Sequence, residues 1–382
     1  MKYEKYSRVF GAKASLHDVY VGSNFSDLPE SLFKGQKHVC VFYGQTGSGK
    51  TYNLLGENNY DLEKSITTTD KLDNPQDTRG LIVRMVKGLF AKINKACGGD
   101  KDKEENYRVT VNYYDIHLDK IRDIGKYINE YLTDSITNDL HSITQDQLER
   151  QFINIHEKPD GSVVLKNLTN IEVNSPKDMA YIIDKGLESQ EVINKRLNVT
   201  SSTVHTIVAL TFRNDEKKRV GKIYCVDLAG SEWNSKNVSE SQRIQESIII
   251  NNSFNTLSRI VNLLRARKAA EEKNEPPPKV QLSYHDSKLT RILQNALTLE
   301  YSLAVFATVY PTDVNFNESI STLRFMDRIR GISSSASQRC LFSPKLMGDD
   351  DEEPSKSDIM LNKLTMENLE LKGVIENQKV SP

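Results

Sequence analysis

The segment GQTGSGKT, residues 44–51, constrains the fold of this chain more than any other stretch. It follows a short apolar run, residues 38–43, that has the composition of a buried parallel strand. Its glycines let backbone N–H groups wrap a phosphate chain, and the pattern GxxxxGK followed by Thr is specific for that task. Strand, glycine loop and helix in this order predict an α/β fold of the P-loop NTPase class.

The same loop indicates which side chains hold a nucleotide. Lys50 is expected to reach the β and γ oxygens, and the Thr51 hydroxyl is expected to ligate Mg²⁺. Tyr52 either stacks on the base or packs in the first turn of the following helix. The predicted cofactor-binding residues are Gly44, Gln45, Thr46, Gly47, Ser48, Gly49, Lys50, Thr51 and Tyr52.

Two downstream segments contain the groups that sensing of a γ-phosphate needs. DLAGSE begins at Asp227, which ends an apolar strand, so its carboxylate can hold the Mg²⁺ shell through water. Gly230 in the same segment lets a backbone N–H approach the phosphate. In NVTSSTVH the hydroxyls of Ser201 and Ser202 can reach the metal from the other side. Each segment alone is a weak signal, but after a P-loop they predict one switch apparatus.

Apolar runs and helical patterns alternate through most of the chain. A long helix is predicted over residues 243–267. Strands are predicted at residues 38–43, 107–116, 205–212, 222–228 and 301–309. This alternation predicts a mostly parallel central sheet with helices on both faces.

Composition narrows the class of protein. The chain has 37% hydrophobic and 27% charged residues and a net charge of −1, which is typical of a soluble globular protein with no global attraction to nucleic acid or membrane. Its four cysteines form no CxxC pair and lie near no His cluster, so we expect reduced thiols in a cytosolic protein. The N-terminus has no apolar targeting segment, and no apolar run is long enough for a bilayer.

The composition changes after Ile332. Residues 333–357 are rich in Ser, Asp and Pro and predict a flexible linker. Over residues 358–382 apolar positions return at heptad spacing, with Asn368 where a polar residue often fixes the register of a two-stranded coiled coil. The start of a coiled coil, and with it a homodimer, is one interpretation, and a frayed single helix or disordered tail is the other.

Several segments together resemble a kinesin motor domain. They are YGQTGSGKT, RGLIVR, NYYDIHLDKIRDI, SSxxH, VDLAGSE, SIIINNSFNTLSRIV, YHDSKLTRILQNAL and NESISTLRF. The resemblance covers residues 3–332, so residues 1–332 are expected to form one motor domain. Myosins and small GTPases share the first loop and analogous switches, but not DLAGSE together with DSKLTR. The resemblance implies an eight-stranded sheet, ATP with Mg²⁺ as cofactors, and microtubules as the partner.

The resemblance also implies roles for single residues. Ser201 and Ser202 would close over the γ-phosphate of ATP, and Gly230 would sense it. Because phosphoryl transfer depends mostly on positioning, Ser202 and Glu232 would order the attacking water. The implied catalytic residues are Lys50, Ser201, Ser202, Gly230 and Glu232, and the implied metal-site residues are Thr51, Ser202 and Asp227.

Two departures from the family pattern bear on activity. Kinesins usually have an Arg after the paired serines that forms a salt bridge with the Glu of DLAGSE, whereas this chain has Thr203 there, so Glu232 lacks its usual partner. Lys195 or Arg196 could substitute, or both could be merely solvated. The family's first strand, with an Arg-x-Arg-Pro motif beside the adenine, has no match. The chain is either an N-terminally incomplete copy or a divergent member with a looser base pocket, and in both cases we expect a sheet short of one strand.

A basic region follows the switches. Residues 259–291 contain eight basic side chains against four acidic ones, a local net charge of +4. In kinesins this region lies on the acidic microtubule surface. A basic stretch can also be a solvated face or suit nucleic acid, but this one lacks the aromatic interleaving of single-strand binders, and no nucleic acid is expected. Lys236 and Arg243 would couple the phosphate site to this surface, or are merely solvated.

The sequence therefore predicts an ATP-driven microtubule motor, a microtubule-stimulated ATPase of the cytoplasm and cytoskeleton. The alternative is a nucleotide-binding microtubule adaptor with weak or absent ATPase activity, motivated by Thr203 and the missing strand. A filament depolymeriser is a third possibility.

Overall fold

The computed structural model describes residues 6–23, 25–57, 77–132, 152–159, 163–232, 241–280, 283–297, 301–310 and 312–330. The predicted linker over 333–357 and the predicted helical tail over 358–382 lie outside these residues, as does Lys236. Arg243 lies within a described helix, but its side chain is outside the described part.

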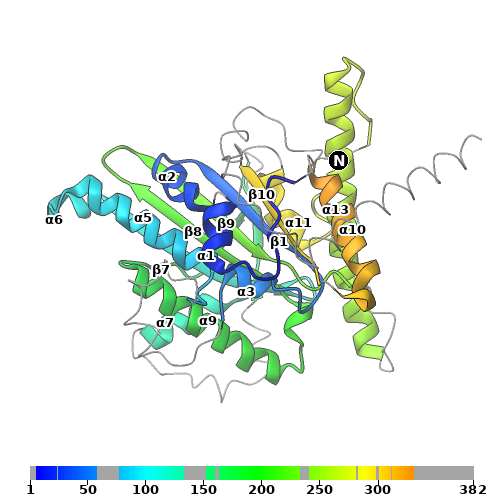
Figure 1. Ribbon diagram of the computed structural model, residues 1–382, viewed down its shortest axis with the longest axis horizontal. Helices are drawn as coiled ribbons and strands as arrows, with labels where there is room; N and C mark the ends of the chain where they lie inside the picture. The colour runs from blue at the N-terminus through cyan, green and yellow to red at the C-terminus, as the bar shows by residue number, and fades with distance from the viewer. Residues whose placement is uncertain are drawn as a thin grey trace, which may run out of the picture.

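One sheet forms the centre of the molecule (Figure 1). Its strands are β1 (Lys37–Gly44), β2 (Tyr107–His117), β3 (Lys120–Asp123), β4 (Phe152–Ile153), β7 (Ile171–Glu172), β8 (His205–Asn214), β9 (Arg219–Asp227) and β10 (Ser302–Thr308). The order is β10-β1-β9-β8-β2-β3-β4, with β7 paired to β2. A separate hairpin consists of β5 (Ile155–Glu157) and β6 (Val163–Leu165). The five strands predicted from the sequence are confirmed.

The prediction of mostly parallel pairing is wrong. β1 is parallel to β10 and β9, but the other pairings in the described sheet are antiparallel. The physical reason is the length of the connections. Leu118 and Asp119, both at positive φ, make a two-residue hairpin turn between β2 and β3, and only residues 215–218 separate β8 from β9. A parallel pair needs a crossover of about a dozen residues or more.

Contrary to the expectation from the sequence, the described sheet is not short of a strand. The described sheet has eight strands, but two of them, β4 and β7, are only two residues long. Within the described part of the chain, β10 pairs on one side only, with β1. No described strand occupies the other side of β10.

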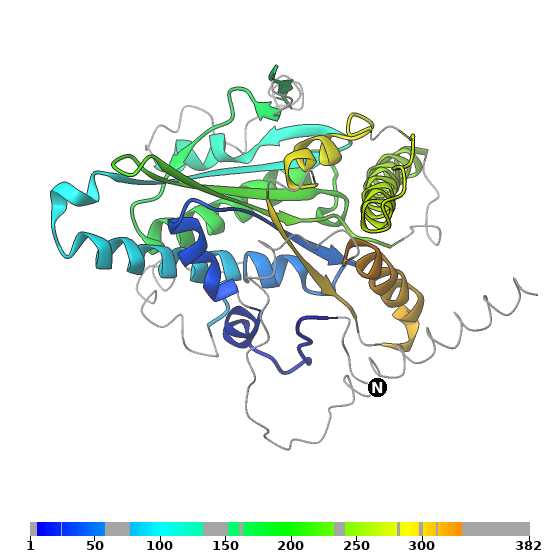
Figure 2. The ribbon, with the colours of Figure 1, turned by 90° about the horizontal axis from the view of Figure 1, so that it is seen from above.

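Helices cover both faces of the sheet (Figure 2). They are α1 (Leu16–Gly22), α2 (Leu28–Phe33), α3 (Lys50–Leu54), α5 (Leu81–Cys97), α6 (Lys101–Glu104), α7 (Ile124–Leu132), α9 (Pro176–Arg196), α10 (Ser241–Glu272), α11 (Lys288–Ile292), α12 (Gln294–Leu297) and α13 (Phe316–Arg330). Three 3-10 turns complete the described elements: η1 (Phe25–Asp27), η3 (Ser201–Thr203) and η4 (Asp313–Asn315). Residues of α1, α2, α5, α7 and α9 share one hydrophobic core with the sheet, and residues of α10, α11, α12 and α13 share the other.

β1 shows how one strand serves both cores. Val39, Val41 and Tyr43 point to the core that contains α10 and α13, whereas Cys40 and Phe42 point to the core that contains α5. This alternation is that of a strand, and burial on both sides explains why the segment is a nearly continuous apolar run. The strand therefore holds the loop at its carboxyl end in a fixed place between the two layers.

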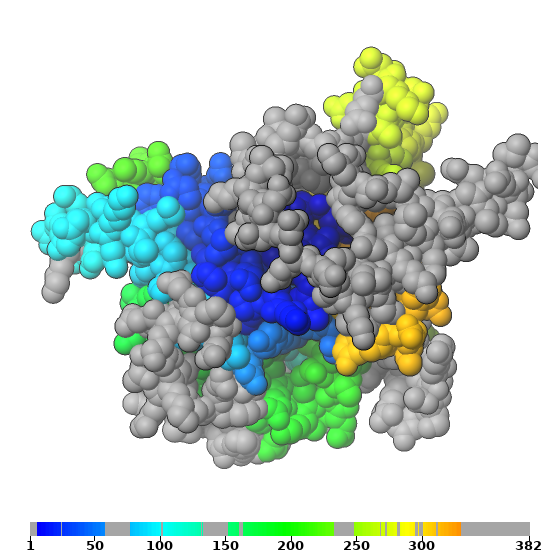
Figure 3. Space-filling view, viewed as in Figure 1, coloured from blue at the N-terminus to red at the C-terminus, as the bar shows by residue number. Residues whose placement is uncertain are grey.

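The described helix α10 contains the predicted helix over 243–267 and extends it at both ends. Leu257, Ile260 and Val261 bury one side of it against the sheet and its neighbours. Its C-terminal part projects beyond the sheet, as the ribbon and the space-filling view show in yellow-green (Figures 1 and 3).

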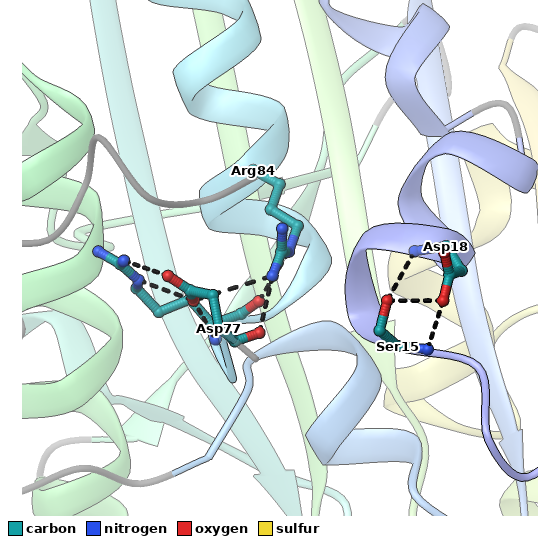
Figure 4. Close-up of polar contacts among 5 residues, drawn as sticks. Ser15, Asp18, Asp77 and Arg84 are labelled. Atoms are coloured by element: carbon teal, nitrogen blue, oxygen red, sulfur yellow. Dashed lines mark hydrogen bonds and ion pairs between the residues drawn. The ribbon is translucent and has the colours of Figure 1, made fainter. Parts of the chain in front are cut away.

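Two polar clusters fix the starts of helices on the face that carries α1 and α5 (Figure 4). The Ser15 hydroxyl accepts the Asp18 N–H at 3.2 Å, and the Asp18 carboxylate accepts the Ser15 N–H at 2.8 Å, which is a capping box for α1. The buried Arg84 guanidinium donates to the carbonyl oxygens of Asp77 (2.8 Å) and Arg79 (3.1 Å). These bonds anchor the chain where it leads into α5.

Three of the four cysteines lie in the described part of the chain. Cys40, Cys97 and Cys225 are buried free thiols, and Cys340 lies outside the described residues. None of the helices in the described ranges combines the length and the apolar character that crossing a bilayer requires.

Candidate nucleotide-binding site

The P-loop occupies the turn between β1 and α3, as the sequence predicts. Gly47 (φ 78°) and Gly49 (φ 97°) adopt left-handed conformations that favour glycine. A side chain at Gly44 would meet the Thr308 carbonyl oxygen, 2.1 Å from an added Cβ. The loop therefore needs its glycines, and Thr308 at the end of β10 forms one of its walls.

Lys50 is buried and folds back over its own loop. Its Nζ donates to the carbonyl oxygens of Gly44 (2.8 Å) and Gln45 (2.9 Å). Burial lowers the pKa of Lys50, while the carboxylates of Asp227 and Glu232 act in the opposite direction. The ammonium group is thus held at the mouth of the loop by neutral oxygens, which phosphate oxygens can replace.

Asp227 lies at the carboxyl end of β9, next to β1, where it faces the helix that begins with the P-loop lysine. Its Oδ2 accepts a hydrogen bond from the Thr51 hydroxyl, whereas its Oδ1 is buried and has no hydrogen-bond partner. Burial raises the pKa of Asp227 to about 6, against the opposing effects of Thr51 and Lys50. A buried carboxylate oxygen with no partner, beside a hydroxyl, is the kind of oxygen pair that Mg²⁺ takes as ligands.

The loop after β9 is attached to the P-loop and to the segment before β8. The Gly230 N–H donates to the Ser202 carbonyl oxygen (2.8 Å), and the Ser231 N–H donates to the Gly44 carbonyl oxygen (3.1 Å). An added Cβ at Gly230 would lie 2.2 Å from the Glu232 carboxylate. The structure thus brings Gly230 and Ser202 together, as the switch interpretation of the sequence requires.

Glu232 has a partner that sequence reasoning missed. Its carboxylate accepts hydrogen bonds from both the backbone N–H (2.9 Å) and the hydroxyl of Thr46 in the P-loop. Lys195, one of the two suggested substitutes, forms an ion pair with Glu191 at 2.6 Å instead. A contact across 186 residues leaves no signal in a single sequence, because nothing local links the two residues.

The hydroxyl groups before β8 bond within their own turn. Thr203 is buried, and its hydroxyl donates to the Thr200 carbonyl oxygen (2.8 Å). The Ser202 hydroxyl donates to the Thr200 hydroxyl (3.2 Å), and Ser201 is exposed. Tyr52, at 45% exposure, remains accessible to a base.

Two further residues, which were not among the predicted site residues, support the site. The Thr308 hydroxyl lies 2.6 Å from the Ser48 hydroxyl, so β10 supports the P-loop from the side. His205 accepts the Ala229 N–H on its Nδ1 (2.9 Å). His205 is the last residue of the segment NVTSSTVH, so the motif itself was a signal for it, whereas Thr308 had none.

The predicted basic surface is built from α10, the segment before α11, and α11. Arg259 of α10 pairs with Asp286, and both side chains are exposed. Arg291 lies 3.7 Å from Glu157 of the β5–β6 hairpin, an acidic neighbour that the sequence count did not include. Asp119, in the turn between β2 and β3, accepts the backbone N–H of Lys288 at 2.6 Å and so fixes the start of α11.

Comparisons relate the chain to known proteins. Residues 2–332 match the family described as the kinesin motor domain. A kinesin heavy chain of Botryotinia fuckeliana is 30% identical over 345 residues, which make up 89% of this chain and 33% of that protein. The kinesin-like protein 3 of Schizosaccharomyces pombe is 30% identical over 336 residues, 87% of this chain and 51% of that protein.

A solved structure, described as that of a fast kinesin, has a TM-score of 0.65 and 28% sequence identity to this chain, and the match covers 87% of this chain and 80% of that one. This chain spans about a third to a half of the length of the two curated relatives.

Proposed function

This chain belongs to the kinesin motor-domain family, and from that premise we propose that it is an ATP-driven microtubule motor whose nucleotide state sets its affinity for the microtubule.

The observation that supports the nucleotide site most strongly is the unpartnered Oδ1 of Asp227 beside the Thr51 hydroxyl. Thr51 and Asp227 would hold Mg²⁺, Asp227 directly or through water, with Ser202 on the other side. When bound, Mg²⁺ neutralises charge on the β and γ phosphate oxygens. Lys50 would exchange its two carbonyl acceptors for phosphate oxygens of ATP, which keeps its buried ammonium satisfied.

The loop after β9 would report the γ-phosphate. In this structure the Gly230 N–H is satisfied by the Ser202 carbonyl oxygen, so binding to a phosphate requires that bond to be exchanged. The exchange would move the segments of Ser202 and Gly230 relative to each other. Ser201, Ser202 and Glu232 would then close over the phosphate and orient the attacking water, a role that depends on position more than on basicity.

The basic surface would bind the microtubule. Its cations, Arg259 on α10 and Arg291 on α11 among them, are partly neutralised by Asp286 and Glu157. Binding to the acidic tubulin surface would compete with these pairs, of which the first is exposed and the second half-buried, and is expected to fall as salt rises. A cytoplasmic, cytoskeletal location follows from this partner, and a homodimer through residues 358–382 remains a proposal from the sequence.

The proposal is tested by co-sedimentation of the chain with microtubules. The chain is expected to pellet with them in the presence of a non-hydrolysable ATP analogue and to be released by ADP. Equal microtubule affinity with both nucleotides, or no binding with either, would overturn nucleotide-controlled attachment.

One observation favours a second candidate, a nucleotide-binding microtubule adaptor with weak ATPase activity. Thr203 uses its hydroxyl within its own turn, and Glu232 is bonded to Thr46. The closed arrangement that an Arg at position 203 would stabilise therefore lacks that support. ATP turnover separates the candidates, since the adaptor would bind microtubules without turnover that responds to them.

A further inference from the structure

The loop that follows β9 is held by four consecutive backbone N–H groups. Three of them donate to carbonyl oxygens, but the Ala229 N–H donates to a side chain, Nδ1 of His205, at 2.9 Å. Ala229 lies between Asp227 and Gly230, so this bond sets the position of the segment that joins the two proposed nucleotide contacts.

The other side of the His205 ring reaches α10. Nε2 of His205 lies 3.2 Å from the Ser253 hydroxyl, and that hydroxyl donates to the Ile250 carbonyl oxygen at 2.7 Å. Because the single hydroxyl proton of Ser253 goes to Ile250, Ser253 must accept from His205. The ring proton is then on Nε2, which leaves Nδ1 as the acceptor that the Ala229 N–H requires. One tautomer satisfies every group in the chain of bonds.

Packing holds the ring in this position. Phe254, the next residue of α10, meets the His205 ring edge to face, with centroids 5.4 Å apart. Phe254 also meets Tyr43 of β1 at 5.6 Å, and Tyr43 packs on Phe325 of α13 at 4.2 Å. His205 is buried, and burial lowers its pKa to about 3, so the ring is neutral at physiological pH.

We propose that His205 is a positioning residue that couples the loop Asp227–Ser231 to α10 through the Ser253 hydroxyl. When the Gly230 N–H changes its partner, Ala229 shifts and the imidazole shifts with it. The imidazole in turn displaces the turn of α10 that contains Ser253 and Phe254. This inference rests on the proposed function for the identity of the two ligands, nucleotide at the loop and microtubule at α10.

The test measures amide hydrogen exchange in the absence of microtubules. Removing the hydroxyl in Ser253→Ala deprives Nε2–H of its acceptor, so the imidazole is held on the α10 side by packing alone and positions its Nδ1 acceptor for the Ala229 N–H less firmly. Even without nucleotide, exchange at Ala229 should therefore rise about three- to tenfold. In wild type, exchange over residues 248–258 should differ between ADP and a non-hydrolysable ATP analogue, each with Mg²⁺, and Ser253→Ala should abolish most of that difference.

Two variants separate coupling from mere stability. Ser253→Thr keeps a hydroxyl and should retain the difference between nucleotides, as should Ser258→Ala, a matched serine truncation on the same helix. A purely structural role of Ser253 would shift exchange equally in both nucleotide states. An unchanged nucleotide difference in Ser253→Ala, its loss in either of the other variants, or its absence in wild type would overturn the inference.

Failure of the motor proposal can be told apart from failure of this inference. If the motor proposal fails, wild type does not bind microtubules, but exchange at Ala229 still reports whether Ser253 holds His205 in place. If wild type does bind microtubules, the ratio of its affinities with the ATP analogue and with ADP should fall about three- to tenfold in Ser253→Ala. A ratio equal to that of wild type would contradict the coupling.

Discussion

Two buried charged side chains, Lys50 and Asp227, set the chemistry at the P-loop. Burial acts against the charged form of both, lowering the pKa of Lys50 and raising that of Asp227 to about 6. Each is only partly compensated in this structure: Lys50 by carbonyl oxygens, Asp227 by one hydroxyl. Under the proposed function, anionic phosphate and a divalent cation would complete both environments.

Lys50→Ala is expected to lower ATP turnover at least about a hundredfold, because it removes the cation that the loop places on the transferring phosphate. Turnover is measured by phosphate release. Lys103→Ala, which removes an exposed cation paired with Asp100, serves as the control and should behave as wild type. A Lys50→Ala enzyme as fast as wild type would remove the loop from the mechanism.

Asp227→Asn should stabilise the nucleotide-free protein in a pH-dependent way. The folded pKa of about 6 lies above the ordinary value of 3.8, so the ionised carboxylate lowers the free energy of unfolding above pH 6. That cost is at most about 3 kcal/mol and disappears as pH falls through 6 toward 3.8. Thermal unfolding should show a higher midpoint for Asp227→Asn at pH 7.5 and a smaller gain at pH 4.5.

The control for this measurement is Asp102→Asn, at an exposed position. The Asp227→Asn protein should also lose most of the stabilisation that Mg²⁺ adds to ADP binding. If Asp227→Asn unfolds at a lower temperature than wild type at pH 7.5, the ionised carboxylate does not destabilise the folded state.

Thr203→Arg is expected to speed microtubule-stimulated ATP hydrolysis. A guanidinium at that position can pair with Glu232, and a shielded charge-assisted pair is worth roughly 1.5 to 3 kcal/mol. The gain is about ten- to a hundredfold if closure limits the rate, and less if the new pair must displace Thr46 from Glu232. The measurement is maximal turnover at saturating microtubules. A rise that persists in Thr203→Arg with Glu232→Ala would rule out the pair as its cause.

At the scale of elements, the sequence predicts what is local and misses what long-range contacts decide. The runs that became β1, β8 and β9 are identifiable because strands buried on both faces are continuously apolar. The predicted direction of strand pairing was wrong because it depends on short turns such as Leu118–Asp119. Such turns interrupt the apolar pattern of the sequence only slightly. The Thr46–Glu232 bond could not be predicted, since it follows from where two loops meet in space.

The surface of α10 and α11 is tested by reversing charge. Lys288→Glu with Arg291→Glu should weaken microtubule binding about tenfold or more at low salt, because it adds repulsion from the acidic tubulin surface and from Glu157. Co-sedimentation over a range of salt concentrations measures this. Arg108→Glu, a single reversal at an exposed position of β2, is the control for charge reversal outside this surface. Equal affinities for the two variants would place the partner surface elsewhere.

At the scale of the whole molecule, the loops that close the proposed nucleotide site lie between two layers of helices. The carboxyl ends of β1 and β9 hold the P-loop and the loop after Asp227, and α10 and α13 pack on the face where Tyr43 meets Phe325. α13 ends at Arg330, and two residues separate it from the linker predicted to begin at residue 333. Under the proposed function, a change at the phosphate site would therefore act on α10, which belongs to the proposed microtubule surface, and on α13.

Steady-state phosphate release at increasing microtubule concentration shows whether microtubules accelerate ATP turnover by this chain. We expect turnover to rise at least about tenfold and to saturate, with Lys50→Ala remaining at background throughout. Turnover of the wild-type chain that stays the same from zero to saturating microtubules would contradict this expectation.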